Sequence, residues 1–273
     1  MQLKLIDYES KLHQDFLNFF NKENYNNKNL EELFHLYCNK LNKQFSSQKY
    51  KVLISKELKS TTNNIVNEIK KDFENGNIDT LNKRLSKASI KEDENDLLLN
   101  NWGIYHLHLG AIRESSFSGR TGLLLFIKII DNKVYFLDLK EHGNFSSIDF
   151  IKIMHNNWSQ EIENFKIKDI VDIEPKPTEE EVFQCWKVGL NIALTFIDNK
   201  NNEVSYLPLS GGVNLGKSPI NATSKWIYLL RTLPEIDNKV NSKCYLRFDY
   251  VNKKFHIEDE NNDVLYTLDF NSL

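Results

Sequence analysis

The sequence predicts an α+β protein, because its hydrophobic spacing changes from helical to strand-like along the chain. In the first hundred residues apolar side chains recur every three or four positions, which is typical of amphipathic helices. After residue 100 the spacing is mostly two, and strand patterns alternate with shorter helical stretches. We therefore expect a helical N-terminal region (1–100), a central antiparallel sheet with helices (101–173) and a small C-terminal α+β unit (178–273).

Composition limits the class of protein. The 273 residues are 40% hydrophobic, which is enough to bury a substantial core, and the formal net charge of −3 provides no overall basic field for nonspecific nucleic-acid binding. The three cysteines, Cys38, Cys185 and Cys244, are too far apart for a metal motif, so we expect free thiols in a reducing compartment. No stretch has the length of a signal peptide or membrane span; a cytoplasmic protein without a membrane partner is expected.

Helical stripes in the N-terminal region span residues 12–20, 30–41 and 65–73, and residues 50–54 suggest one short strand. In the central region, residues 102–109 alternate as a strand, and residues 122–130 and 133–139 form a hairpin. Both faces of this hairpin are apolar, so we expect cover on each side, supplied by the N-terminal helices. Residues 147–157 return to helical spacing.

The C-terminal unit begins after a proline-containing linker at residues 173–178. Thr178 and Glu181 have the spacing of a capping box, which predicts a helix start. The remaining elements are expected to be a hairpin (191–209), a glycine-rich loop, a helix (222–233) and a three-stranded meander (243–270).

Candidate catalytic residues concentrate in the central region. His106 and His108 stand two apart on the predicted strand, so they share a face at roughly 6.5–7 Å, and His142 lies just beyond the third strand. Two such imidazoles could act as a general acid and base, bind phosphate or supply metal ligands. The structural alternative is that one histidine caps a sheet edge while the other is a satisfied core residue.

Candidate substrate-binding residues lie around the same strands. Arg113 and Arg120 fall on the connecting loop, and the planar guanidinium fork suits a phosphodiester. Lys128 and Tyr135 face each other across the predicted hairpin and could add a cation and a phenol. Together with the histidines, these residues make metal-independent cleavage of RNA chemically feasible, and we expect neither a cofactor nor a metal ion.

The segment from Leu124 to Leu139, Leu-Leu-Phe-Ile-Lys-Ile-Ile-Asp-Asn-Lys-Val-Tyr-Phe-Leu-Asp-Leu, follows a strand and an arginine-containing loop and precedes a histidine. This order, over residues 104–145, resembles the C-terminal sheet of RelE-like toxins, which are bacterial ribonucleases. The resemblance implies phosphate contact by Arg113 or Arg120, with His142 near the scissile bond. Members of that family are usually small, basic, single-domain proteins, whereas this chain is large and slightly acidic.

Two other motifs compete. Val134 to Lys140 resembles the strand of restriction-like nucleases, in which a carboxylate, here Asp138, holds Mg²⁺ and a lysine, here Lys140, orients the attacking water. No acidic residue lies within the preceding strand, however. Gly211 to Ser218 matches the P-loop pattern, but it follows the second arm of a hairpin and not a buried parallel strand, so an ordinary glycine-rich loop or a simple anion site is favoured.

The leading hypothesis is therefore a metal-independent endoribonuclease of toxin or antiviral-defence type, with RNA as substrate. The second is a noncatalytic binding or assembly subunit whose histidines are structural and whose partner is a protein, such as an antitoxin or a complex subunit. The Mg²⁺-dependent nuclease using Asp138 and Lys140 is a further alternative.

Overall fold

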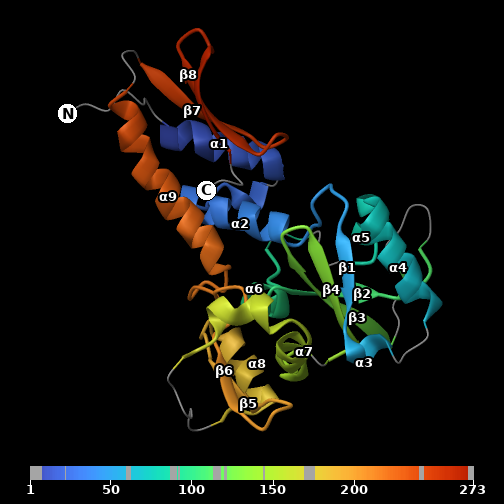
Figure 1. Cartoon of the computed structure of the whole chain (residues 1–273). Helices are drawn as coiled ribbons and strands as arrows, with labels where there is room; N and C mark the ends of the chain where they lie inside the picture. The colour runs from blue at the N-terminus through green and yellow to red at the C-terminus, as the bar shows by residue number, and fades with distance from the viewer. Residues whose placement is uncertain are drawn as a thin grey trace. The chain divides into compact units, whose positions relative to one another are not determined.

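The computed structural model describes residues 8–21, 23–59, 63–86, 91, 93–112, 118–119, 122–143, 145–168, 176–239 and 243–269. These residues form nine α-helices and nine β-strands in three sheets, which confirms the α+β class (Figure 1). The chain divides into two compact units, one of residues 40–220 and one that joins residues 1–39 to 221–273. These units group the segments differently from the three consecutive regions expected from the sequence.

The unit of residues 40–220 is built on a four-stranded sheet of order β1-β4-β3-β2. Strands β2 (Ile104–His108), β3 (Leu123–Ile130) and β4 (Lys133–Glu141) pair antiparallel, as predicted. The expectation of a wholly antiparallel sheet was wrong at one edge, because β1 (Lys51–Ile54) pairs parallel with β4. Residues 56–102, with their helices, separate β1 from the antiparallel strands, and a parallel pair needs such a long crossover.

Helices from the first hundred residues cover one face of this sheet. Val66, Ile69 and Phe73 of α4 (Asn64–Asn75) pack in a core with Ile127 and Phe136. The short helices beside this core are α3 (Lys56–Lys59) and α5 (Ile78–Asn82). The predicted cover by N-terminal helices is therefore confirmed for this face.

Later elements cover the opposite face, where the prediction of N-terminal cover was wrong. A core that includes Trp102, Phe126, Phe150 and Trp186 packs there. Its elements are α7 (Asp149–Trp158), the 3₁₀ helix η3 (Ser159–Phe165), α8 (Glu179–Lys187) and the hairpin of β5 (Leu194–Ile197) and β6 (Glu203–Tyr206). The capping box of Thr178 and Glu181 starts α8 as predicted, whereas residues 173–175 of the expected linker lie outside the described residues.

The sequence analysis missed the short helices α3 and α5, and also a third short helix that leads into β2. Helix α6 (Leu97–Trp102) precedes β2, so Trp102 ends a helix and does not begin the strand. Gly103 closes this helix in the left-handed region with φ of 66°, a conformation that suits glycine. A helix of six residues is too short to show a helical period.

The other compact unit contains α1 (Tyr8–Phe20), η1 (Glu23–Tyr25), α2 (Leu30–Asn42, of which the last three residues belong to the first unit) and α9 (Ile220–Asp237). Its sheet is the predicted meander, with β7 (Cys244–Asp249), β8 (Lys254–Asp259) and β9 (Val264–Asp269) in that order. Rings from both chain segments form its core, since Phe16 packs on Phe34 and Phe248. Within the described residues, no helix has the length and apolar character needed to cross a membrane.

Candidate functional site

Strand β2 places His106 and His108 on one face of the four-stranded sheet, as the spacing predicts. Their ring centroids lie 6.3 Å apart. In the sheet register His106 stands opposite Phe126 and His108 opposite Leu124. Since directly paired residues share a face, both imidazoles belong to the side of the sheet covered by α7.

His142 joins these two histidines through a phenylalanine. The Phe145 ring lies 5.2 Å from the His106 ring and 5.1 Å from the His142 ring, measured between centroids. His142 is exposed, whereas the His106 side chain is only 12% exposed. The cluster therefore offers one sheltered and one accessible imidazole, both next to one aromatic ring.

Asp96 is a member of this cluster that the sequence analysis missed. Its Oδ1 accepts a hydrogen bond from the Leu99 backbone N–H at 3.0 Å and so caps α6, while its Oδ2 lies 3.7 Å from Nδ1 of His106. An aspartate directly before an apolar run is a helix-start signal, and that signal was present in the sequence. Burial lowers the pKa of His106, an effect that Asp96 opposes and His142 reinforces. The sheltered imidazole is thus held in its neutral form near pH 7.

The predicted arginines cannot be placed, because Arg113 and Arg120 lie outside the described residues. The described ends of their loop meet closely: the Gly119 N–H donates to the Ala111 carbonyl, and a Cβ added to Gly110 would lie 2.1 Å from the Gly119 oxygen. Buried Arg84 supports this junction by donating to the carbonyls of His108 and Gly110, both at 3.3 Å.

Lys128 and Tyr135 are neighbours in the hairpin register, as expected, but both are buried. The Lys128 ammonium donates to the Trp102 carbonyl at 2.7 Å and to the Leu209 carbonyl at 3.2 Å. Burial lowers its pKa to about 7. Tyr135 packs its ring against Trp158, 4.9 Å away. Neither side chain has access to an RNA strand in this structure, so their contribution here is to packing.

Asp138 and Lys140 share the face of the histidines, because they stand opposite Phe126 and Leu124. Asp138 Oδ1 accepts from the Leu139 N–H at 2.8 Å, and burial raises the pKa of this carboxyl. Lys140 Nζ lies 2.6 Å from Asp149 Oδ2 and is held in that ion pair. The described residues contain no group of three or more His, Cys, Asp or Glu side chains placed to hold a metal ion.

In the loop from Gly211 to Ser218, several backbone N–H groups already donate to oxygens of the protein. Val213 N–H donates to the Asn191 side chain, and the N–H groups of Asn214, Lys217 and Ser218 donate to oxygens within the loop. A P-loop instead points such groups at phosphate. The preceding strand is one arm of an antiparallel hairpin, so this segment is an internally bonded loop.

A second group of hydrogen-bonded side chains, which the sequence analysis also missed, connects α7 to the β5–β6 hairpin. His155 Nδ1 lies 2.8 Å from the Tyr206 hydroxyl and its Nε2 lies 3.4 Å from Asp198 Oδ2. Asp198 also accepts from the N–H groups of Lys200 and Asn202 and thereby shapes the hairpin turn. Its hydrogen bonds lower the pKa of Asp198 to about 2. Since Tyr206 is fully buried, these hydrogen bonds hold the helix against the hairpin.

The histidine cluster is therefore the arrangement with the clearest chemical capacity among the described residues: an aspartate, a sheltered imidazole and an accessible imidazole around one aromatic ring. Comparisons of the chain with protein-family models, with curated proteins and with solved structures find no match.

Proposed function

We propose that this protein is a metal-independent endoribonuclease of toxin or antiviral-defence type. The observation that carries the proposal is that His106 lies beside both Asp96 and Phe145, and that His142 lies next to the same phenylalanine ring. An imidazole beside a carboxylate and close to a second imidazole is an arrangement suited to general acid–base catalysis.

In the proposed reaction His106 is the general base. Asp96 lies beside Nδ1, so Nε2 is the nitrogen that takes the proton from the ribose 2′-hydroxyl. The 2′-oxygen attacks phosphorus, the bond to the 5′-oxygen breaks, and His142 donates a proton to that leaving oxygen. The products are a 2′,3′-cyclic phosphate and a free 5′-hydroxyl, and no redox step or metal ion is needed. Arg113 and Arg120 are proposed to stabilise charge on the phosphorane.

The test is incubation of the purified protein with labelled RNA and DNA, with and without EDTA. We expect the protein to cleave RNA but not DNA, and to do so in the presence of EDTA. The H106A and H142A variants should each cleave at least a hundredfold more slowly than wild type. H256A is the matched control, because His256 belongs to a different sheet and should cleave at the wild-type rate. Normal cleavage by both H106A and H142A would refute the mechanism, and EDTA-sensitive cleavage would direct attention to Asp138 and Lys140.

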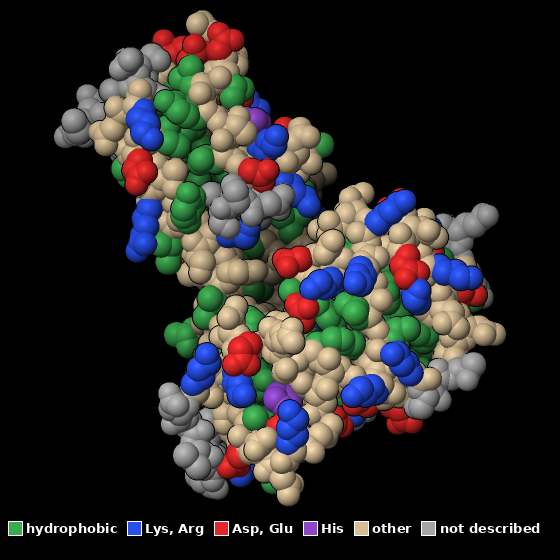
Figure 2. Space-filling view, viewed as in Figure 1, with side chains coloured by type: hydrophobic (Ala, Val, Ile, Leu, Met, Phe, Trp, Pro, Cys, Tyr) green, Lys and Arg blue, Asp and Glu red, His purple; other side chains and the backbone are tan. Residues whose placement is uncertain are grey.

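A second candidate function, a noncatalytic assembly subunit, is favoured by one observation. The formal net charge is −3, and basic and acidic side chains are interspersed on the face shown in Figure 2. A protein partner does not require the basic field that favours RNA binding. Absence of cleavage, together with co-purification of a stable stoichiometric partner, would support this function instead.

A further inference from the structure

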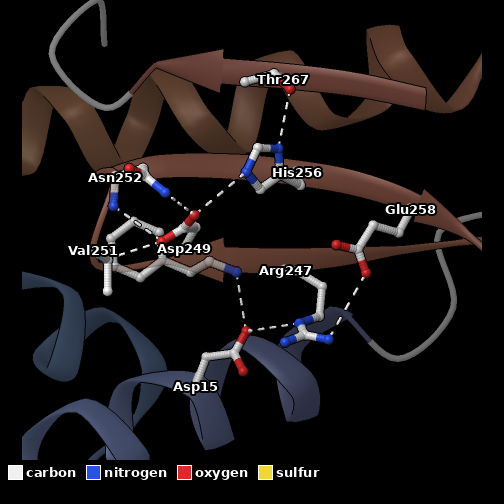
Figure 3. A network of polar contacts seen from close by, with 9 residues as sticks. Asp15, Arg247, Asp249, Val251, Asn252, His256, Glu258 and Thr267 are labelled. Atoms are coloured by element: carbon white, nitrogen blue, oxygen red, sulfur yellow. Dashed lines mark hydrogen bonds and ion pairs between the residues drawn. The ribbon is translucent and has the colours of Figure 1, made fainter. Parts of the chain in front are cut away.

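The two edges of the β7-β8-β9 sheet differ. Helix α1 covers the β7 edge, where Asp15 Oδ2 accepts a hydrogen bond from the Phe248 N–H at 3.0 Å and lies 3.9 Å from Arg247 (Figure 3). Within the part of the chain that the structure describes, β9 pairs with β8 alone, so its outer edge has no strand beside it. Native proteins usually protect such an edge, because its backbone groups invite pairing with another strand.

Apart from one bulge, strand β9 has few of the features that usually prevent pairing. Val264, Leu265 and Tyr266 are 52%, 39% and 37% exposed. The strand contains no lysine and no proline, and its only formal charge is at Asp269. The bulge in the β8–β9 register leaves Leu265 without a partner in β8, whereas residues 266–269 pair regularly. The edge is therefore regular over residues 266–269, and no described strand covers it.

We propose that β9 pairs antiparallel with β9 of a second copy of this chain, which joins two sheets into one of six strands. A two-fold axis perpendicular to the sheet requires opposed residues to share a face, and a register centred on Thr267 satisfies this requirement. Tyr266 then lies opposite Leu268 of the second copy, on the apolar face that carries Phe255 and Ile257. Thr267 is bonded to His256 on the polar face (Figure 3). In the proposed register it lies opposite Thr267 of the second copy.

The charge of β9 is compatible with this register. Asp269 lies opposite Leu265 of the second copy, so like charges do not face each other. The two Asp269 residues are separated by four positions along the joined strands, about 13 Å at 3.3 Å per residue. That separation exceeds the screening length of about 8–10 Å near physiological salt.

Helix α9 supplies further apolar surface in the same unit. Ile227, Tyr228 and Leu230 are exposed on it, and hydrophobic side chains are visible along this helix in Figure 2. Lys225, one turn before Tyr228, lies within electrostatic reach of Asp269 at the end of β9. A perpendicular two-fold places both α9 helices on the same side of the joined sheet.

The test is sedimentation of the full chain over a range of concentrations. Wild type is compared with two variants that place opposite charges at the same position, Leu265. Wild type should form a dimer. L265D places a second carboxylate opposite Asp269 and should raise the dissociation constant at least tenfold above that of L265K, which places a lysine there. V251D, in the β7–β8 turn, should dimerise like wild type. A wild type that is monomeric at every concentration, or equal dimerisation of L265D and L265K, would overturn the proposal.

Disulfide trapping tests the register itself. In a C185S background, where Cys38 and Cys244 are buried, T267C should form an intermolecular disulfide, because opposed Cα atoms in an antiparallel pair lie about 4.5–5.5 Å apart. D269C should not crosslink, since about 13 Å separates its equivalents. Crosslinking of D269C without T267C would exclude this register. Both experiments read association and not cleavage, so their outcome is separate from that of the proposed ribonuclease activity.

Discussion

Asp96 Oδ2 lies 3.7 Å from Nδ1 of His106, while the other oxygen of the same carboxylate caps helix α6 at the Leu99 N–H. One side chain thus caps a helix and places a carboxylate near an imidazole on the adjacent strand, at a distance longer than a hydrogen bond. Because α6 ends directly before β2, local backbone structure alone brings the two residues together.

Substitution of Asp96 by asparagine separates these two roles. Asparagine is a good N-cap, so the free energy of unfolding should change little, whereas D96A should lose about 1 kcal/mol. Loss of the carboxylate charge removes the effect that raises the pKa of His106, so this pKa should fall further. The acidic limb of the pH–rate profile for RNA cleavage should move to lower pH, and the maximal rate should fall about tenfold or more. A D96N profile that superimposes on the wild-type profile would contradict the assigned role.

The close approach of Gly110 and Gly119 predicts an asymmetric effect of two identical substitutions. G110A would put its Cβ 2.1 Å from the Gly119 carbonyl oxygen, so the backbone must shift, and we expect a loss of about 1–3 kcal/mol in urea unfolding. G119A meets no atom within 4 Å and should stay within about 0.5 kcal/mol of wild type. Equal stabilities of the two variants would show that the junction is not closed in solution.

Much of the fold could be predicted from the sequence, because the spacing of hydrophobic residues reflects which side chains are buried. Leu125 and Ile127 on one face of β3, and Leu124 and Phe126 on the other, belong to two separate cores, as their alternation predicts. The shared face of His106 and His108 follows from the same rule.

Other features had no local signal. The parallel pairing of β1 with β4, and the packing of Phe16 on Phe248, join residues that are more than 80 positions apart. Asp96 carried a capping signal, but its distance to His106 depends on a helix of six residues, too short for a period to be read. Lys128 was interpreted as a substrate contact because the sequence could not reveal that two carbonyls would enclose its ammonium.

The bond from Tyr206 to His155 should contribute measurably to stability. Y206F removes a buried hydroxyl that lies 2.8 Å from His155 Nδ1, and we expect a loss of about 1 kcal/mol in the free energy of unfolding. Y250F is the matched control, because Tyr250 is 43% exposed, and its change should be within about 0.5 kcal/mol. Equal changes in Y206F and Y250F would mean that His155 gains nothing from the phenol.

Lys128 should make stability depend on alkaline pH. Its pKa is about 7 in the folded protein and near the ordinary lysine value of about 10.4 in the unfolded chain, so between these values the unfolded chain binds one more proton. The free energy of unfolding therefore gains up to about 1.4 kcal/mol per pH unit from this residue as pH rises above 7. Cys38 acts in the opposite direction, because burial raises its pKa to about 12 and the unfolded thiol loses its proton first.

The quantity to measure is therefore the difference in unfolding free energy between wild type and K128M, by urea denaturation from pH 7 to pH 9. Cys38 is present in both proteins and cancels, so the difference should change steadily in favour of wild type as pH rises. K133M is the control, since Lys133 is partly exposed and pairs with Glu161 at 2.8 Å, and its difference from wild type should be nearly constant with pH. A constant difference for K128M as well would mean that Lys128 keeps its charge to pH 9, and that its two carbonyl partners offset the cost of burying that charge.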